Sequence, residues 1–205
     1  KVATTVFTSG CNFNCKYCHN RSLIKKTEGI LDEEEVFDFF QKRINMLDAL
    51  VITGGEPTLY GQALIAFCHR FKQLFPNKLL KVDTNGSHPE MIQALSEIAD
   101  FCAMDFKSDD YSSFSTIDLS TINRSLQQII KFQDFEIRVT LFPDYVDQKS
   151  LKKILDMVKF NGIKKITLQQ YRPLEKNEKT YSKEEIEGWF RAMQEKEIAV
   201  LYRGF

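Results

Sequence analysis

The chain has 205 residues, enough for one domain with a sizeable core and too few for two ordinary domains with a linker, so we expect a single domain over residues 1–205. Its 28 basic and 28 acidic residues balance, which argues against a general DNA binder or a protein held on an anionic membrane. Hydrophobic residues make up 43% of the chain, but no uncharged apolar stretch is long enough to span a bilayer. The sequence starts at Lys1 and has no signal-like apolar stretch, which predicts a cytoplasmic protein whose numbering begins after a trimmed start.

Apolar runs typical of strands alternate with helical patterns along the chain. The first run, residues 2–7, ends at Ser9-Gly10, and a cysteine-rich loop follows. A capping-box pattern then begins at Asp32, and it is followed by apolar residues at helical spacing, Val36, Phe40, Ile44 and Leu47. Further strands are expected at 50–53, 79–84, 101–106, 135–142, 165–169 and 199–202. Further helices are expected at about 59–75, from Ser87 and Pro89 onward, at 119–132, at 149–160, and after a second capping box at Ser182.

This alternation predicts an α/β fold in which six strand–helix units form a parallel sheet with covering helices. Functional sites in such folds gather at the C-terminal ends of the strands. Polar and glycine residues follow the expected strands: Cys11, Cys15 and Cys18; Gly54-Gly55-Glu56-Pro57; Asp83-Thr84-Asn85-Gly86; Asp105 and Lys107; and Gln169-Gln170-Tyr171. We expect them to converge on one rim.

The inner face of the sheet is predicted to be polar. Alternation along the fifth strand places Glu136, Arg138 and Thr140 on one face, and Asp105 and Lys107 share a face of the fourth. A closed eight-stranded barrel is instead filled with branched aliphatic side chains. The pattern therefore predicts a partial (β/α)6 TIM-like barrel with a wet interior that holds a ligand.

Cysteine usage points to metal or redox chemistry. The chain has five cysteines, an odd number, and Cys11, Cys15 and Cys18 fall within eight residues, which is not the pattern of a disulfide scaffold. Cys68 and Cys102 stand alone in apolar segments, where we expect small buried hydrophobic side chains without a function.

Three thiolates suit an iron–sulfur cluster better than zinc. Structural zinc takes four ligands, and His19, the nearby candidate for the fourth, adjoins Cys18; adjacent residues rarely bind one tetrahedral ion, so a Cys3His zinc site is open but not favoured. In a [4Fe–4S] cluster with one thiolate per iron, three cysteines leave one iron free for an exogenous ligand.

The segment 11–20, Cys-Asn-Phe-Asn-Cys-Lys-Tyr-Cys-His-Asn, resembles the cluster motif of the radical S-adenosylmethionine (radical SAM) superfamily. Gly54-Gly55-Glu56-Pro57 is similar to that family's second-strand motif, whose backbone and carboxylate hold the amino group of SAM. Within the superfamily, segments 17–20, 83–86 and 104–107 resemble activating enzymes of glycyl-radical enzymes, above all the anaerobic ribonucleotide reductase activating proteins of the type similar to the pyruvate formate-lyase activator. The resemblance covers nearly the whole chain.

The resemblance implies a site for two cofactors. Cys11, Cys15 and Cys18 would hold a [4Fe–4S] cluster whose fourth iron is chelated by SAM. Residues matching Asp83, Thr84 and Asp105 form a small monovalent-cation site beside the SAM carboxylate, which a lysine matching Lys107 contacts. The full expected SAM-binding set is Tyr17, Gly54, Gly55, Glu56, Asp83, Thr84, Asn85, Asp105, Lys107, Arg138 and Tyr171.

The chain also departs from the family pattern. Asn85-Gly86 is at the same time a common turn pair. Arg172 stands where the pyruvate formate-lyase activator has a histidine. No additional cysteine-rich insert is present, so one cluster is expected.

The resemblance further implies an oxygen-sensitive oxidoreductase that cleaves SAM reductively, forms a 5′-deoxyadenosyl radical and abstracts hydrogen from a glycine of a partner, expected to be anaerobic ribonucleotide reductase. No side chain is needed as an acid or base. Reduced flavodoxin or ferredoxin is the implied electron donor. Two alternatives remain at this point: a small-molecule radical SAM enzyme of the 7-carboxy-7-deazaguanine synthase type, and a metal-binding module or electron carrier without SAM chemistry. The Cys-His-Asn sequence at the third cysteine favours the activating enzyme.

Overall fold

The computed structural model describes all residues, 1–205, and contains one seven-stranded parallel sheet whose strands follow one another in chain order. The strands are β1 (Ala3–Thr8), β2 (Ala49–Gly54), β3 (Leu79–Thr84), β4 (Phe101–Asp105), β5 (Asp134–Leu141), β6 (Lys165–Gln170) and β7 (Ala199–Arg203). The helices are α1 (Glu33–Lys42), α2 (Gln62–Leu74), α3 (Pro89–Leu95), α4 (Leu119–Ile129), α5 (Gln148–Phe160) and α6 (Lys183–Met193), with short 3-10 turns η1 (Arg21–Leu23) and η2 (Pro57–Tyr60).

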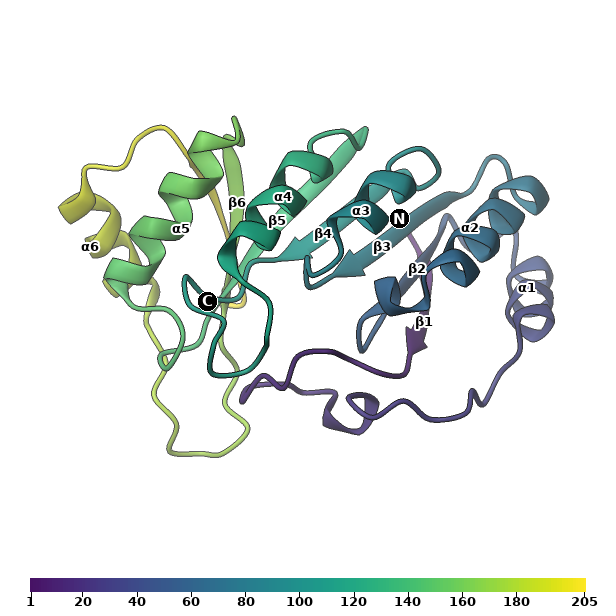
Figure 1. Ribbon diagram of the computed structural model, residues 1–205, viewed down its shortest axis with the longest axis horizontal. Coiled ribbons are helices and arrows are strands. Elements are labelled where there is room, and N and C mark those ends of the chain that lie inside the picture. Colours follow the sequence, from purple (N-terminus) through teal and green to yellow (C-terminus); the bar gives the residue numbers. More distant parts are fainter.

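The sheet forms part of a barrel that does not close. Each strand pairs in parallel with the next, and β1 and β7 form opposite edges that do not pair with each other. Figure 1 shows the helices arrayed along one side of this sheet, while the segment that follows β1 runs along the lower edge. The predicted partial (β/α)6 barrel is confirmed.

The predicted elements differ from the observed ones mainly at helix ends. α1 ends at Lys42 and is followed by turns at 43–46. Ile44 and Leu47, which the spacing placed in the helix, therefore lie beyond its end. The predicted helix at 59–75 is two elements, since Gly61 adopts a φ of +53° between η2 and α2. α3 begins at Pro89 as predicted, but its N-cap residue is His88 rather than Ser87.

Both predicted capping boxes are present. In α1 the Asp32 side chain accepts from the backbone N–H of Glu35, whose carboxylate accepts from the backbone N–H of Asp32, both at 2.9 Å. Ser182 and Glu185 make the same reciprocal pair at the start of α6. These bonds satisfy N–H groups that a helix leaves without intrahelical partners.

The hydrophobic core lies between the sheet and the helices, and the opposite face of the sheet is polar. On β5, Ile137, Val139 and Leu141 are at most 1% exposed. Glu136 and Arg138 occupy the alternate positions, opposite Ala103 and Asp105 of β4. The predicted alternation is therefore confirmed, and it directs charged side chains into the concave side of the sheet. No helix has the length and apolar character needed to cross a membrane.

That the whole chain is one domain stays a prediction, and α6 offers a test. Ile186 is the buried residue of α6 and is 0% exposed. Replacing a buried Ile by Ala removes contacts and leaves a cavity, so Ile186→Ala should cost about 2–5 kcal/mol of unfolding free energy. Denaturant unfolding followed by both circular dichroism and Trp189 fluorescence should show one transition, shifted as a whole. A separate early transition for the Trp189 signal would show that the C-terminal part unfolds independently.

Candidate cofactor site

A cavity of about 220 Å³ opens at the C-terminal ends of β1 to β5. It is lined by every residue that the sequence singled out for cluster or SAM binding except Tyr171: Cys11, Cys15, Tyr17, Cys18, Gly54, Gly55, Glu56, Asp83, Thr84, Asn85, Asp105, Lys107 and Arg138. Phe13, His19, Asn20, Ile24 and Thr53 also line it. Segments far apart in sequence thus meet in one place.

The cysteine loop is held over the cavity by backbone hydrogen bonds. The N–H groups of Gly10 and Cys11 donate to the carbonyls of Leu23 and Ile24 at 2.8 and 2.9 Å. The loop is thereby closed on itself, with Cys15 buried and Cys11 and Cys18 partly exposed. Burial raises the pKa of the Cys15 thiol to about 11, and it also raises the pKa of Cys11. Without a metal these thiols are protonated at neutral pH, so iron would have to displace their protons.

The arrangement is not that of a single-ion site. No three His, Cys, Asp or Glu side chains are grouped closely enough to hold one metal ion. In a cubic cluster each thiolate binds a different iron, so its cysteines lie farther apart than the ligands of one ion. The His19 imidazole is hydrogen-bonded through Nε2 to the Arg172 carbonyl at 3.2 Å, away from a shared tetrahedral site with Cys18. The donor set therefore fits a cluster better than the Cys3His zinc alternative.

Gly54 and Gly55 are required by close backbone packing. A Cβ on Gly54 would lie 2.4 Å from the N and O atoms of Thr8, and one on Gly55 would lie 2.1 Å from the Gly10 carbonyl oxygen. This proximity allows the Gly55 N–H to donate to Thr8 and the Glu56 N–H to donate to Gly10, both at 2.8 Å. The two glycines thus fasten the end of β2 to the start of the cysteine loop.

The buried Glu56 carboxylate joins segments of the site, and we call Glu56 with Thr58, Thr84 and Asn85 the Glu56 clamp. The Glu56 side chain is 0% exposed and accepts hydrogen bonds from the Thr58 N–H (3.1 Å) and hydroxyl (2.6 Å), the Thr84 hydroxyl (2.8 Å) and the Asn85 N–H (2.6 Å). Burial raises the pKa of the carboxyl, whereas these hydrogen bonds lower it. The expected role of Glu56 as the acceptor for the SAM ammonium stays a prediction; in this structure its oxygens join η2 to the end of β3 and to Asn85.

Thr84 and Asn85 belong to the same clamp. The Thr84 hydroxyl donates to Glu56 and accepts from the Gly86 N–H at 3.1 Å, and its expected contact with a cation stays a prediction. The Asn85 amide donates to Asn12 Oδ1 at 2.9 Å, and its oxygen accepts from the Ser87 N–H at 3.0 Å. Asn85 is therefore both a turn residue and a tie to the cysteine loop. Sequence analysis missed Asn12, since a lone Asn in a loop carries no signal.

Charged side chains form a chain of ion pairs that lines the cavity and extends beyond it to Lys81. Arg138 Nε lies 2.7 Å from Asp105 Oδ1, and Arg138 Nη1 lies 3.5 Å from Asp83 Oδ2. The Lys107 ammonium lies 3.3 Å from Asp105, and the Lys81 ammonium lies 3.1 Å from Asp83. Two cations, Lys107 and Arg138, thus line the cavity with these two aspartates, and Glu56 adds a third carboxylate to the lining. Arg138 stands between the carboxylates for which the resemblance implied a small cation, and it supplies positive charge there.

The pKa shifts follow from these pairs. Burial raises the pKa of Asp105, but the Arg138 guanidinium and the Lys107 ammonium lower it further, to about 2. Burial lowers the pKa of Lys107, while Asp105 and then Tyr17 hold it well above its usual range. Asp105, Lys107 and Arg138 are therefore charged at neutral pH, and the two cations suit an anionic ligand such as a carboxylate.

Two buried polar atoms lack a hydrogen-bond partner, and both lie at this cavity. They are Tyr17 Oη and Asp83 Oδ1, the latter near Lys81 but outside hydrogen-bonding geometry. Buried polar atoms are rarely left unpaired in a folded protein. Together with the partly exposed thiols and the cations Lys107 and Arg138, they fit a site for a polar ligand and an iron–sulfur cluster.

Tyr171 and Arg172 lie outside this cavity. Tyr171 is 1% exposed, packs its ring edge-on against Tyr17 at 6.2 Å and donates its hydroxyl to Glu178. Its expected contact with SAM stays a prediction, and in this structure it packs against Tyr17. Arg172 lines a neighbouring cavity of about 260 Å³, together with Tyr17, His19 and Arg203.

Comparison with known proteins identifies the family. The profile described as the radical SAM superfamily matches residues 5–161, which include the cysteine loop, the glycine pair and the ion-pair residues. The chain therefore belongs to the radical SAM superfamily. Radical SAM enzymes use a [4Fe–4S] cluster and SAM, and the chain is an enzyme of this superfamily, which decides against a metal-binding module without enzyme activity.

Three relatives bear on the subgroup. A protein of Methanocaldococcus jannaschii assigned as a glycyl-radical enzyme activating enzyme is 33% identical over 198 residues, covering 89% of this chain and 78% of the relative. A second such protein of the same organism is 29% identical, covering 73% and 60%. The 7-carboxy-7-deazaguanine synthase of Thermococcus kodakarensis is 29% identical over 122 residues, covering 49% and 47%.

Solved structures share the fold. Streptococcus suis SuiB bound to S-adenosylmethionine has a TM-score of 0.67 at 13% identity, covering 99% of this chain and 50% of that chain. The radical SAM methyltransferase TsrM of Kitasatospora setae, with cobalamin and a [4Fe–4S] cluster, has a TM-score of 0.63 at 12% identity, covering 84% and 37%. This radical SAM chain thus spans half or less of those proteins.

Gly55→Ala tests the backbone contact between the glycine pair and the cysteine loop. The new Cβ would meet the Gly10 carbonyl, so we expect a loss of at least about 2 kcal/mol in unfolding free energy and a lower iron content after reconstitution. Gly188→Ala in α6 is the control, because its Cβ would meet nothing closer than 3.8 Å. It should raise helix stability by up to about 1 kcal/mol. Equal stability of the two variants would contradict the packing argument.

Glu56→Gln separates the clamp from a ligand contact. Gln replaces one acceptor oxygen by an NH2 group that faces N–H and O–H donors, so we expect a loss of about 2–3 kcal/mol in the absence of SAM. Exposed Glu90→Gln is the control. Chemical denaturation of the ligand-free protein measures the difference. Unchanged stability together with weaker SAM binding would instead support Glu56 as an acceptor for the ammonium.

Proposed function

We propose that this radical SAM chain is an activating enzyme that generates a glycyl radical on a partner enzyme, and that the partner is anaerobic ribonucleotide reductase. The observation that carries the proposal is the single cavity that joins the cysteine loop to the Asp83–Arg138–Asp105 group. The M. jannaschii relative, similar over 89% of the chain, supports the activating class.

The cluster would be held by Cys11, Cys15 and Cys18 in the loop over the cavity. Of the five cysteines, the two others, Cys68 and Cys102, are 0% exposed in the core, which agrees with one cluster. When bound, the cluster and SAM supply a radical that abstracts hydrogen. The protein would supply the binding groups, their orientation and the exclusion of water.

The ion-pair group would orient SAM through its carboxylate. Lys107 and Arg138 carry the positive charge that such a carboxylate needs, and their pairing with Asp105 fixes their positions. Because Arg138 already stands between Asp83 and Asp105, a bound monovalent cation would have to share or displace that position. The Tyr17 ring would contribute a wall of the site, with the Lys107 ammonium 5.7 Å from its centroid.

A second candidate function is a reaction on a small molecule. The similarity to 7-carboxy-7-deazaguanine synthase covers 49% of the chain, and a neighbouring cavity that includes Arg172 and Arg203 lies beside Tyr17 and His19. The two functions differ in the atom that loses hydrogen, which is a peptide glycine in the first and a carbon of a free metabolite in the second.

The experiment is anaerobic reconstitution with iron and sulfide, reduction, and analysis for 5′-deoxyadenosine formed from SAM. Cys15→Ala should lower cleavage to background because one cluster ligand is lost. Cys68→Ala, a buried cysteine outside the site, should retain cleavage. Cleavage in both variants, or in neither, would contradict the assignment of the cluster to the loop.

The partner is tested by adding anaerobic ribonucleotide reductase to the reduced, SAM-loaded protein. A doublet in the electron paramagnetic resonance spectrum that disappears when the partner's radical-site glycine is changed to Ala supports the proposed function. SAM cleavage without a protein radical, together with formation of 7-carboxy-7-deazaguanine, would support the small-molecule reaction.

A further inference from the structure

The loop that carries the three cysteines also carries unbalanced positive charge. Residues 10–27 contain no acidic side chain, yet they contain four exposed cationic ones, Lys16, Arg21, Lys25 and Lys26, which we name the loop patch. The chain as a whole has no net charge. An excess of four positive charges in 18 residues is therefore a local feature of the cofactor loop rather than of the composition.

Few acidic groups neutralise the loop patch. Lys16 pairs with Asp144 at 2.9 Å, but both side chains are more than half exposed, so water weakens this pair. Arg21 donates to the Lys16 carbonyl, the Lys26 ammonium lies 5.0 Å from the centre of the Tyr60 ring, and Lys25 has no ion-pair partner. Cations elsewhere are more often paired, as Lys72 is with Asp100 and Lys159 with Glu195.

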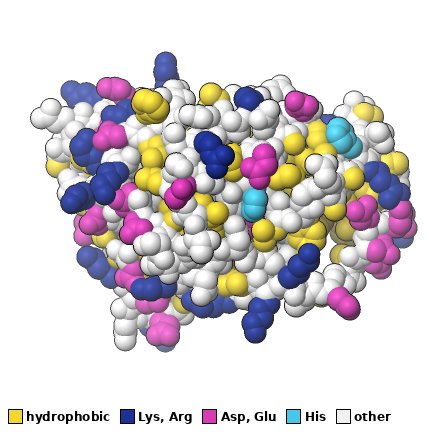
Figure 2. Space-filling view, viewed as in Figure 1, with side chains coloured by type: hydrophobic (Ala, Val, Ile, Leu, Met, Phe, Trp, Pro, Cys, Tyr) yellow, Lys and Arg dark blue, Asp and Glu magenta, His cyan; other side chains and the backbone are white.

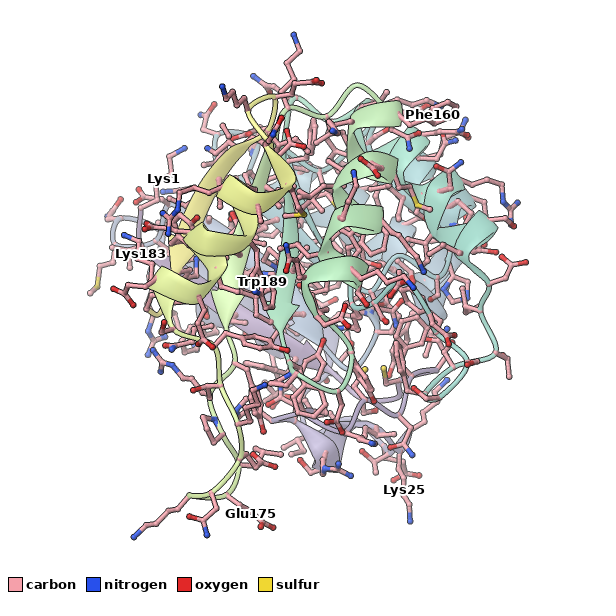
Figure 3. The ribbon with its side chains drawn as sticks, turned by 90° about the vertical axis from the view of Figure 1, so that its left-hand side faces the viewer. Lys1, Lys25, Phe160, Glu175, Lys183 and Trp189 are labelled. Atoms are coloured by element: carbon pink, nitrogen blue, oxygen red, sulfur yellow. The ribbon has the colours of Figure 1, made fainter.

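The loop patch lies on the outside of the cofactor site. Figure 1 places the segment after β1 along the lower edge of the molecule, and Figure 2 shows Lys and Arg side chains along the middle of that edge. In Figure 3, Lys25 projects from the lower end, opposite Phe160. The same loop holds Cys11 and Cys18, which are partly exposed. One loop thus separates the cationic surface from the proposed cluster position.

Reductive cleavage of SAM consumes an electron that has to enter from outside, since the chain offers one cluster site and no second redox cofactor motif. We propose that the loop patch is the docking surface for an acidic protein that carries a low-potential one-electron donor. The inference rests on the proposed function. In the transfer the carrier loses one electron and the cluster gains it, with no bond made or broken and no proton required.

The positive charge of the loop patch favours an acidic partner, and the extent of the patch favours a protein. The four cationic groups extend over an exposed loop, so they suit a broad partner surface better than a small anion. Complementary charge of this kind raises association rates by about 10- to 1,000-fold at low salt, and the effect falls as salt screens it.

The test compares two triple variants of the cluster-loaded protein that change net charge equally. The patch variant is Lys16→Glu, Lys25→Glu, Lys26→Glu. The control variant is Lys42→Glu, Lys131→Glu, Lys196→Glu, three exposed lysines in the segments that precede β2, β5 and β7, at the opposite ends of the strands. Reduced flavodoxin is the acidic probe, and photoreduced 5-deazariboflavin is the uncharged reductant.

The readouts are the rate of cluster reduction, followed by absorbance and electron paramagnetic resonance, and the Kd for flavodoxin by calorimetry. We expect the patch variant to accept electrons from flavodoxin at least about tenfold more slowly at low salt, with a flatter salt dependence and weaker binding. Its reduction by deazariboflavin should match that of the unchanged protein, and the control variant should behave normally with both reductants.

Equal slowing in the two variants, or none in either, would overturn the docking surface. Normal reduction by flavodoxin together with loss of glycyl-radical formation would instead assign the patch to the radical-accepting partner.

If the triple variant holds less cluster, the double variant Lys25→Gln, Lys26→Gln replaces it. A salt dependence of its reduction rate unchanged from that of the original protein would overturn the proposal. A cluster that flavodoxin reduces but that never cleaves SAM would refute the proposed function while leaving the docking surface intact.

Discussion

The buried carboxylate of Glu56 is the interaction on which the site depends. A charged group with no solvent contact is stable in a protein only when its oxygens are fully hydrogen-bonded, and four donors from η2 and the loop after β3 meet this requirement. Its own N–H donates to Gly10 at the start of the cysteine loop. The end of β2 with η2, the end of β3 and the start of the cysteine loop are thereby held together beside the cavity.

Positive charge lies both inside that cavity and on the surface outside it. Inside, Arg138 and Lys107, which are held in place by Asp83 and Asp105, supply positive charge that suits the carboxylate of an amino-acid ligand. Outside, the loop patch presents cations to solvent over the same cysteines. The inner charges act at short range where water is excluded, whereas the outer charges act at longer range and are sensitive to salt. Ligand binding and electron entry would therefore respond differently to ionic strength.

The structure adds hydrogen bonds between segments to the ligand contacts that the sequence predicted. Glu56, Thr84 and Asn85 are predicted to contact ligands, and their polar atoms also join separate segments to one another. Tyr171 likewise supports Tyr17 from behind the cavity. A motif shows that residues are needed together, and only the hydrogen-bond partners show whether each touches the ligand. Asn12 contributes to the same network without any sequence signal.

The sequence by itself determined the order of strands and helices, because alternation of period two and helical spacing are local consequences of backbone geometry. It also determined the chemistry of the rim, since Cys11, Cys15 and Cys18 and the polar ends of successive strands meet wherever a parallel sheet forms. Tertiary structure alone decided that the Glu56 carboxylate is buried and hydrogen-bonded, whereas the Asp105 carboxylate is paired with Arg138. Those outcomes depend on contacts between residues far apart in the chain, 28 residues for Glu56 with Thr84 and 33 for Arg138 with Asp105, and no local pattern encodes such distances.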